Sequence, residues 1–175
     1  YRLRTLEKDM MEKTLQGSIK TLTDMLAIVK PELFGQINRL KRISNSIAKE
    51  LKYPDLWEVN ISAQLCNLGF VSVPDEVIER LYKGAQLSLQ DKKMLEESNE
   101  ISVKLVENIP RLESISGIIK QCRTSYQSAQ AEKVSLHPIA RILKVASDYI
   151  ELSNLTEDNN EIIKEMSTIR LSLYD

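Results

Sequence analysis

Residue types that metal centres and disulfide scaffolds require are scarce in this sequence. Its 175 residues include 1 histidine, His137, and 2 cysteines, Cys66 and Cys122. A single imidazole cannot build a metal centre that several histidines hold, and two cysteines are too few for a disulfide framework. Cysteine used this sparingly is typical of a reducing compartment, so we expect a cytoplasmic protein.

The sequence also has no excess of charge of one sign and no long apolar run. Its 24 lysines and arginines nearly balance its 25 aspartates and glutamates, which leaves a net charge of -1. Because a nucleic-acid interface needs a basic excess, we expect no nucleic-acid partner. No apolar stretch approaches the about 20 residues of a membrane span, and none has the features of a signal peptide, so we expect no membrane partner.

Turn-forming residues are few as well, with 5 glycines and 5 prolines. Apolar residues recur at helical spacing, which indicates an all-α protein, and the length suffices for a single domain with a sizeable core. We expect about seven or eight helices. Their expected extents are about 3–29, 31–51, 56–68, 75–82, 88–106, 112–119, 138–146 and 157–171.

Residues that start or stop helices support these boundaries. Pro31 is suited to the first turn of the second helix. Asp55, Asp75 and Ser88 are candidate N-caps, because their side chains can accept a hydrogen bond from a free backbone N–H group. Gly69 is placed to end the third helix.

The first expected helix begins with a narrow apolar stripe formed by Leu3, Leu6 and Met10. The next heptad positions carry a lysine and a glycine, so a coiled coil here would be short. A stripe of this kind packs either inside its own domain or along a partner helix, and both interpretations stay open.

These features predict how the chain is organised. We expect residues 1–29 to be a lead-in helix that either connects the chain to an upstream domain or forms the seam of a homodimer. We expect residues 30–175 to form one helical domain. Because the first residue is Tyr1 rather than methionine, we expect the sequence to be part of a longer protein.

One stretch has the frame of a known metal-binding motif. Residues 63–78 read Ala-Gln-Leu-Cys-Asn-Leu-Gly-Phe-Val-Ser-Val-Pro-Asp-Glu-Val-Ile. The stretch resembles the motif of the HD-GYP family, within the HD phosphohydrolase superfamily, which reads roughly Leu-His-Asp-Ile-Gly-Lys-Ile-Gly-Ile-Pro-Asp-x-Ile-Leu. The matching residues are Leu65, Gly69, Pro74, Asp75 and the flanking aliphatic residues.

The metal-binding residues of that motif are replaced in this chain. Cys66 and Asn67 stand where the family has its His-Asp pair, and Phe70 stands where it has a lysine that contacts phosphate. The resemblance extends over about residues 12–152 and implies further ligand positions. Gln36 stands at the position of the family's first metal histidine, and Ser98 stands at that of a later histidine. Cys122-Arg123 corresponds to the paired histidines before the GYP loop, and Ser147 corresponds to a metal-binding aspartate.

The GYP loop itself, Asp-Gly-x-Gly-Tyr-Pro, is absent. Residues 124–133 form a shorter polar connection in its place. The following segment, Ala140–Ser147, resembles the family's Ala-Arg-Ile-x-x-Val-Ala-Asp, with Ser147 in place of the aspartate and Asp148 one position late.

The resemblance implies a fold whose catalysis has been lost. HD-GYP domains hydrolyse cyclic di-GMP at an iron centre, where imidazole and carboxylate donors converge from several helices and the metal acidifies a bound water. Since every ligand position is substituted here, we expect no catalytic residue, no metal ligand and no cofactor, and we expect the substituted residues to line one region between helices. This vestigial site comprises Gln36, Cys66, Asn67, Phe70, Ser98, Cys122, Arg123 and Ser147.

Three features have both a functional and a structural interpretation. Cys66 and Cys122 are either a residual metal or redox site or two small buried hydrophobic residues. Arg123 and Arg141 are candidate contacts for the phosphate of a ligand, whereas Arg141 alternatively pairs with a carboxylate between helices. His137 is either a lone base or a residue at the surface or cap of a helix.

The function predicted from the resemblance is that of a catalytically inactive signalling or interaction module, the output part of a bacterial response regulator or sensor protein, downstream of a receiver or sensor domain. The alternatives are a receptor that binds a cyclic dinucleotide without cleaving it, an HDOD-type regulatory domain, and an enzyme with relocated chemistry. A collapsed apolar region around Cys66, Asn67 and Phe70 favours the module, and an open cavity lined by Arg123 and Arg141 favours the receptor.

Overall fold

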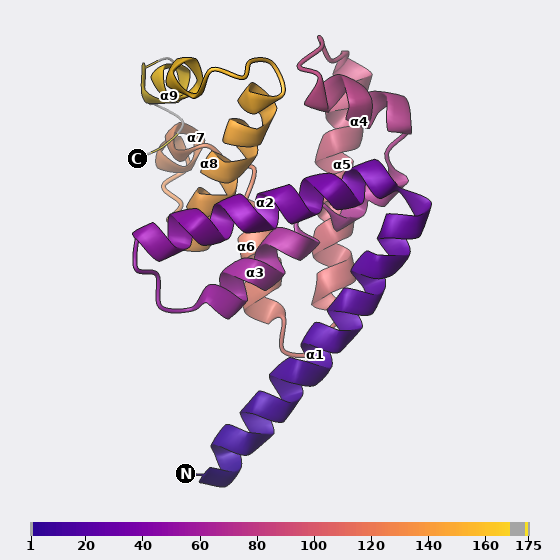
Figure 1. The fold of residues 1–175 in the computed structure, drawn as a ribbon, viewed down its shortest axis with the longest axis vertical. Coiled ribbons are helices and arrows are strands. Elements are labelled where there is room, and N and C mark those ends of the chain that lie inside the picture. Colours follow the sequence, from indigo (N-terminus) through magenta and orange to yellow (C-terminus); the bar gives the residue numbers. More distant parts are fainter. Residues whose placement is uncertain (1, 169–173, 175) are drawn as a thin grey trace. The chain divides into compact units, whose positions relative to one another are not determined.

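A computed structural model describes residues 2–168 and 174 of the chain (Figure 1). Every regular element within these residues is helical, which confirms the predicted all-α class. In chain order the elements are α1 (Arg2–Val29), α2 (Pro31–Glu50), α3 (Leu56–Leu65), the 3-10 helix η1 (Leu68–Ser72), α4 (Asp75–Tyr82), α5 (Leu89–Glu107), α6 (Glu113–Gln121), α7 (Tyr126–Ala131), α8 (Pro138–Ser153) and α9 (Asn159–Thr168).

The described residues contain nine α-helices, whereas the apolar spacing predicts seven or eight. The additional helix is α7, a short element inside the segment 124–133, for which the sequence indicates only a polar connection. Ser125 supports it as N-cap, because its hydroxyl accepts a hydrogen bond from Ser128 N at 3.1 Å. The expected continuation of the last helix to residue 171 lies outside the described residues.

The predicted caps at Asp55 and Ser88 are confirmed. Asp55 Oδ1 accepts from Glu58 N at 3.0 Å, and Ser88 forms a reciprocal capping box with Asp91. Two boundary predictions are wrong. The third helix ends at Leu65, before Gly69, and Asp75 lies in the first turn of α4 rather than at its cap.

The chain divides into two compact units, Tyr1–Gln36 and Ile37–Asp175. The first unit holds α1 and the beginning of α2, and the second holds the rest of α2 and all later elements. α1 has 28 residues and is the longest helix of the described chain, as predicted for a lead-in helix. α2 begins at Pro31, where a proline costs no hydrogen bond.

α1 presents apolar side chains to solvent. Leu6 and Met10 are 56% and 70% exposed, while the side chain of Leu3 lies outside the described part. Near the end of the helix Leu22, Met25 and Val29 are exposed as well. Their spacing of three and four residues is the spacing of a seam between paired helices.

The core of the second unit forms where α3, α5 and α8 pack against α6 (Figure 1). Leu65, Ile115, Ile119, Ile139 and Leu143 are almost completely buried there. Burial of one such side chain stabilises the fold by roughly 1.5–3 kcal/mol. The central position of α6 therefore determines where its last residues, and the polar residues that follow them, are placed.

A close approach fixes η1 against α5. Gly69 N donates to Ser102 Oγ at 2.7 Å, and a Cβ atom on Gly69 would lie 1.8 Å from the carbonyl oxygen of Ser98. No side chain fits at that distance, so residue 69 must be glycine for η1 to pack at this depth. The glycine of the motif thus serves helix packing and does not terminate α3.

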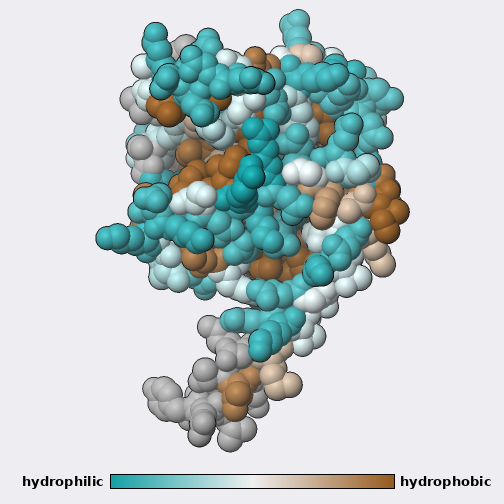
Figure 2. Space-filling model, viewed as in Figure 1, coloured by the Kyte–Doolittle hydropathy of each residue, from teal (hydrophilic) through white to brown (hydrophobic). Residues whose placement is uncertain are grey.

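The surface of the second unit is mainly hydrophilic on the face seen in Figure 2, with hydrophobic patches between the polar residues. Among the described helices, none has the length and apolar character needed to cross a membrane.

Candidate functional site

The junction of α3 and η1 places the first group of predicted site residues. α3 is buried along most of its length, including Val59, Ile61 and Leu65, so its C-terminal end lies inside the second unit. Cys66 is the C-cap of α3, and Asn67 is the N-cap of η1. The turn between α3 and η1 therefore carries a thiol and an amide next to each other.

Cys66 and Cys122 lie together. Cys122 is the C-cap of α6, which packs against α3, and both cysteines are buried and free of disulfides. Cys66 Sγ lies 3.5 Å from Ala63 O, and Cys122 Sγ lies 3.9 Å from Asn99 Oδ1. The two thiols are close enough for each to shift the pKa of the other. Both helices thus end at the same buried point.

The pairing acts on the two thiols in opposite directions. The hydrogen bond to Cys122, together with burial, raises the pKa of Cys66 well above its ordinary value. The hydrogen bond from Cys66 lowers the pKa of Cys122, and the neighbouring Arg123 charge acts in the same direction. Cys66 is therefore the thiol that keeps its proton.

Arg123 joins the two halves of this region. Its Nη2 atom donates to Asn67 Oδ1 at 3.2 Å, and its guanidinium carbon lies 4.6 Å from the centroid of the Phe70 ring. Phe70 is only 2% exposed. The half-buried Asn67 thus has a side-chain hydrogen-bond partner, and the same guanidinium lies against the buried Phe70 ring. We call Cys66, Asn67, Phe70, Cys122 and Arg123 the thiol–guanidinium cluster.

Two further residues adjoin the cluster. Burial raises the pKa of Tyr82, at the end of α4. The charge of Arg123 lowers this pKa, whereas Cys66 and Glu151 raise it. Ser98 is buried on α5, where its hydroxyl donates to Leu95 O at 2.7 Å and its backbone carbonyl faces Gly69. Ser98 therefore lies next to η1, but its hydroxyl is used within its own helix.

Ser147 and Gln36 are placed less directly. Ser147 is half-buried on α8, a helix that packs against α3 and α6. Its neighbour Asp148 is buried and accepts hydrogen bonds from Lys144 Nζ at 2.6 and 2.7 Å and from Tyr174 at 2.7 Å. Gln36 is the last residue of the first unit, so its association with the cluster stays a prediction.

The donor set of the cluster does not fit an iron centre. The Asn67 amide oxygen accepts a hydrogen bond from Arg123, and the guanidinium cation beside it would repel a metal cation. Nor do the described residues contain any group of three or more histidine, cysteine, aspartate or glutamate side chains able to hold a metal ion.

The two arginines proposed as ligand contacts belong to different features. Arg123 is part of the cluster, whereas Arg141 lines a surface pocket of about 400 Å³ beside α7. Both hollows that Arg141 lines among the described residues lack Arg123. Apart from Arg141, the lining of this pocket could not be predicted from the sequence, because it comes from residues 126–136, which carry no recognisable motif.

His137 has a capping role. Its Nδ1 atom accepts a hydrogen bond from Ile139 N at 3.3 Å, and its backbone N–H donates to Gln121 Oε1 at 2.8 Å. The helix-cap interpretation of His137 is thus confirmed. The imidazole is committed to the start of α8.

Comparison with known proteins gives one match. Residues 20–175 match the family model described as HD domain. Neither a curated protein nor a solved structure matches the chain. Because the family match covers most of the sequence, the chain belongs to the HD domain family.

Proposed function

We propose that this member of the HD domain family is a catalytically inactive signalling or interaction module of the HD-GYP type. The observation that carries the proposal is the position of Arg123, which donates to Asn67 and lies over Phe70. These three residues surround the position where the resemblance implies the metal-binding pair and the phosphate-binding lysine. A cation and an aromatic ring replace the donors that a metal-activated water would need.

The remaining polar groups of the cluster support the same proposal. Hydrolysis of a phosphodiester needs an activated nucleophile and a group that takes up its proton. Cys66 and Cys122 are both buried, and the higher pKa of Cys66 keeps it in the neutral form. His137 is committed to a helix cap, so the single imidazole of the chain is remote from this role.

A turnover assay tests the proposal. The chain is incubated with cyclic di-GMP under anaerobic conditions, with and without added ferrous and manganous ions, beside an active cyclic di-GMP phosphodiesterase as positive control. We expect turnover equal to the blank without enzyme and no stoichiometric iron by elemental analysis. Metal-dependent turnover by the chain that an Asn67→Ala variant lacks would overturn the proposal.

The alternative of a non-hydrolysing receptor for a cyclic dinucleotide has one observation in its favour, the position of Arg141 at a pocket. The engagement of Arg123 with Asn67 and Phe70 favours the interaction module instead, because a ligand phosphate would have to displace Arg123 from both. Calorimetric titration with cyclic di-GMP separates the two: binding without turnover, abolished in Arg123→Gln, favours the receptor. An HDOD-type domain remains the alternative assignment of the fold.

The proposed context is a longer signalling protein. An upstream receiver or sensor domain would act through the lead-in helix α1, and a second copy of the chain would pair along it in a homodimer. The exposed apolar residues of α1, including Leu6, Met10 and Met25, support this proposal, because an isolated helix gains most of its stability from burying such a face. A cytoplasmic location is part of the same proposal.

A further inference from the structure

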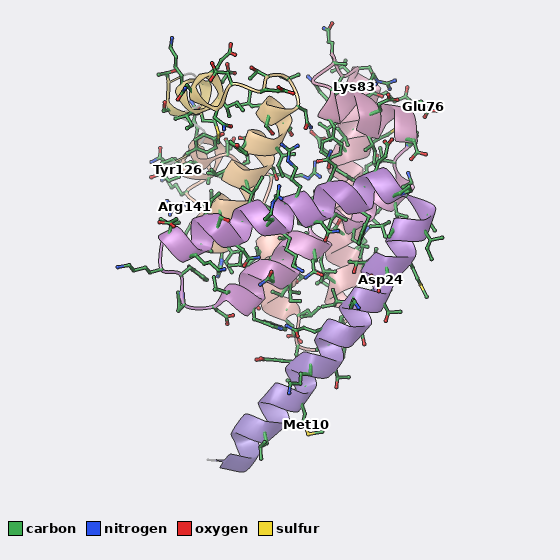
Figure 3. The ribbon with its side chains drawn as sticks, viewed as in Figure 1. Met10, Asp24, Glu76, Lys83, Tyr126 and Arg141 are labelled. Carbon is green, nitrogen blue, oxygen red and sulfur yellow. The ribbon has the colours of Figure 1, made fainter. Side chains whose placement is uncertain are left out.

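The pocket beside α7 is formed by residues that the proposed function does not use. It has a volume of about 400 Å³ and lies entirely in the second unit, between α7, the segment after it and the first turn of α8. Figure 3 labels Tyr126 and Arg141, which face this region from α7 and α8. The pocket is lined by Tyr126, Ala129, Gln130, Lys133, Val134, Ser135, Leu136 and Arg141.

A narrower hollow of about 20 Å³ continues the pocket. It shares Tyr126, Leu136 and Arg141 with the larger one and extends the lining toward Lys144. None of the described residues lining either hollow belongs to the thiol–guanidinium cluster. The pocket is thus a separate feature, with a volume inside the about 300–1,000 Å³ that is usual for sites of small molecules.

The lining combines positive charge with apolar surface. Lys133 and Arg141 contribute cations, and the lining residues that the structure describes include no aspartate or glutamate. Lys144, which lines the narrower hollow, forms an ion pair with Asp148. Tyr126 and Leu136 are half-buried and provide the apolar wall. Such a lining favours an anion carried on a flat apolar body.

The backbone around Lys133 is held in place before any ligand arrives. Lys133 has a left-handed φ of 56°, its N–H donates to Gln130 O at 3.1 Å, and Val134 N donates to Ala129 O at 2.9 Å. This pattern of hydrogen bonds is a Schellman closure, in which glycine is the usual residue at the left-handed position. The same closure ends α2, where Lys52 has a φ of 52°, so Lys52 offers a matched control.

We propose that this pocket binds a small molecule with one carboxylate or phosphate group on a flat ring. Lys133 and Arg141 hold the anionic group, and the ring lies against Tyr126 and Leu136. The two anionic groups share the chemistry that the cations recognise, and the ring distinguishes the ligand from inorganic phosphate. This inference goes beyond the proposed function, and its failure leaves the proposal of an inactive module unaffected.

Nuclear magnetic resonance titration of the whole chain tests the inference. The probes are benzoate and phenyl phosphate, with benzyl alcohol as the neutral ring and inorganic phosphate as the anion without a ring. We expect saturable shifts of the Tyr126, Val134 and Leu136 amides with the two anionic rings and much weaker binding of both controls. Whichever of benzoate and phenyl phosphate binds more tightly shows whether the pocket prefers a carboxylate or a phosphate group.

Variants make the test specific. We expect Lys133→Gln to weaken binding about tenfold, the effect of losing one charge-assisted hydrogen bond, and Arg141→Gln to weaken it at least as much. Lys52→Gln removes the same charge from the same kind of helix end and is expected to leave binding unchanged. Lys133 is exposed, so its variant folds even if Arg141→Gln does not.

Three results would overturn the inference. They are the absence of saturable shifts in the pocket, equal binding of benzyl alcohol, and equal weakening by Lys133→Gln and Lys52→Gln. Shifts confined to Asn67, Phe70 and Arg123 would likewise assign binding to the cluster and not to the pocket.

Discussion

Arg123 and Phe70 are far apart in the sequence, yet the guanidinium carbon of Arg123 lies 4.6 Å from the centroid of the Phe70 ring. The contact joins the end of α6 to η1 and covers the turn that carries Cys66 and Asn67. The consequences of this contact for stability can be measured.

The Phe70 ring is expected to matter more for stability than the charge above it. Phe70→Ala removes a side chain that is 2% exposed and should cost about 3–5 kcal/mol in the free energy of unfolding, measured in urea. Arg123→Ala should cost about 0.5–1 kcal/mol, as for a cation–π contact at an exposed site. Val71→Ala, at a neighbouring position that is 43% exposed, serves as the control and should change stability by at most about 0.5 kcal/mol.

A methyl group at Gly69 should disrupt the packing of η1 on α5. Gly69→Ala places its Cβ atom 1.8 Å from Ser98 O, so the two elements must separate and the melting temperature should fall sharply. Gly117→Ala is the matched control, because nothing lies within 4 Å of the added atom on α6. There alanine should stabilise the helix by roughly 0.5–1 kcal/mol. Similar melting temperatures for the two variants would contradict the close approach.

The two thiols should be protected in the folded chain and unequal in acidity. We expect neither to react with a disulfide reagent until the protein is unfolded, since both are buried. Cys66→Ala removes the hydrogen bond that lowers the pKa of Cys122, so ultraviolet detection of the thiolate should show Cys122 ionising at higher pH. Cys66→Ser keeps a hydroxyl donor and should preserve the lower pKa. Equal titration of Cys122 in both variants would contradict the hydrogen bond.

Asp91 should make stability depend on pH in the acid range. The hydrogen bond from Arg80 and the one from Ser88 N lower the pKa of Asp91 in the folded protein. Its contribution is therefore complete above the ordinary carboxyl value of about 3.9 and is lost as the pH falls through the lower folded pKa. Denaturation of wild type and Asp91→Asn should show a stability difference at pH 6 that disappears at about pH 2.

Pairing of two chains through α1 should depend on its exposed apolar residues. Met25→Glu adds a charge at a residue that is 59% exposed and lies in the stripe with Leu22 and Val29. We expect it to weaken dimerisation at least about tenfold by light scattering. Gln16→Glu adds the same charge at an exposed polar position and should have no effect. A wild-type chain that stays monomeric at high concentration would remove the basis for the homodimer.

Local patterns in the sequence determined the secondary structure. The apolar spacing of residues 3–29, the Asp55 and Ser88 caps and the proline at residue 138 act over one or two helical turns, so their effects can be predicted without knowing the fold. α7 escaped prediction because six residues are too few to show an apolar period, and only the Ser125 cap indicates it. The scarcity of histidine, likewise a property of composition, excluded a multi-histidine centre.

The tertiary structure decided which side chains meet. Cys66 and Cys122 are joined because α3 and α6 end at one buried point, and Arg123 reaches Asn67 because α6 lies between α3, α5 and α8. Gly69 is glycine because Ser98 approaches it from another helix, which no local pattern contains. The α7 pocket, for the same reason, unites Lys133 with Arg141 from separate segments. Helix periodicity specifies which face is buried, whereas the choice of the partner face depends on how all the helices fill space together.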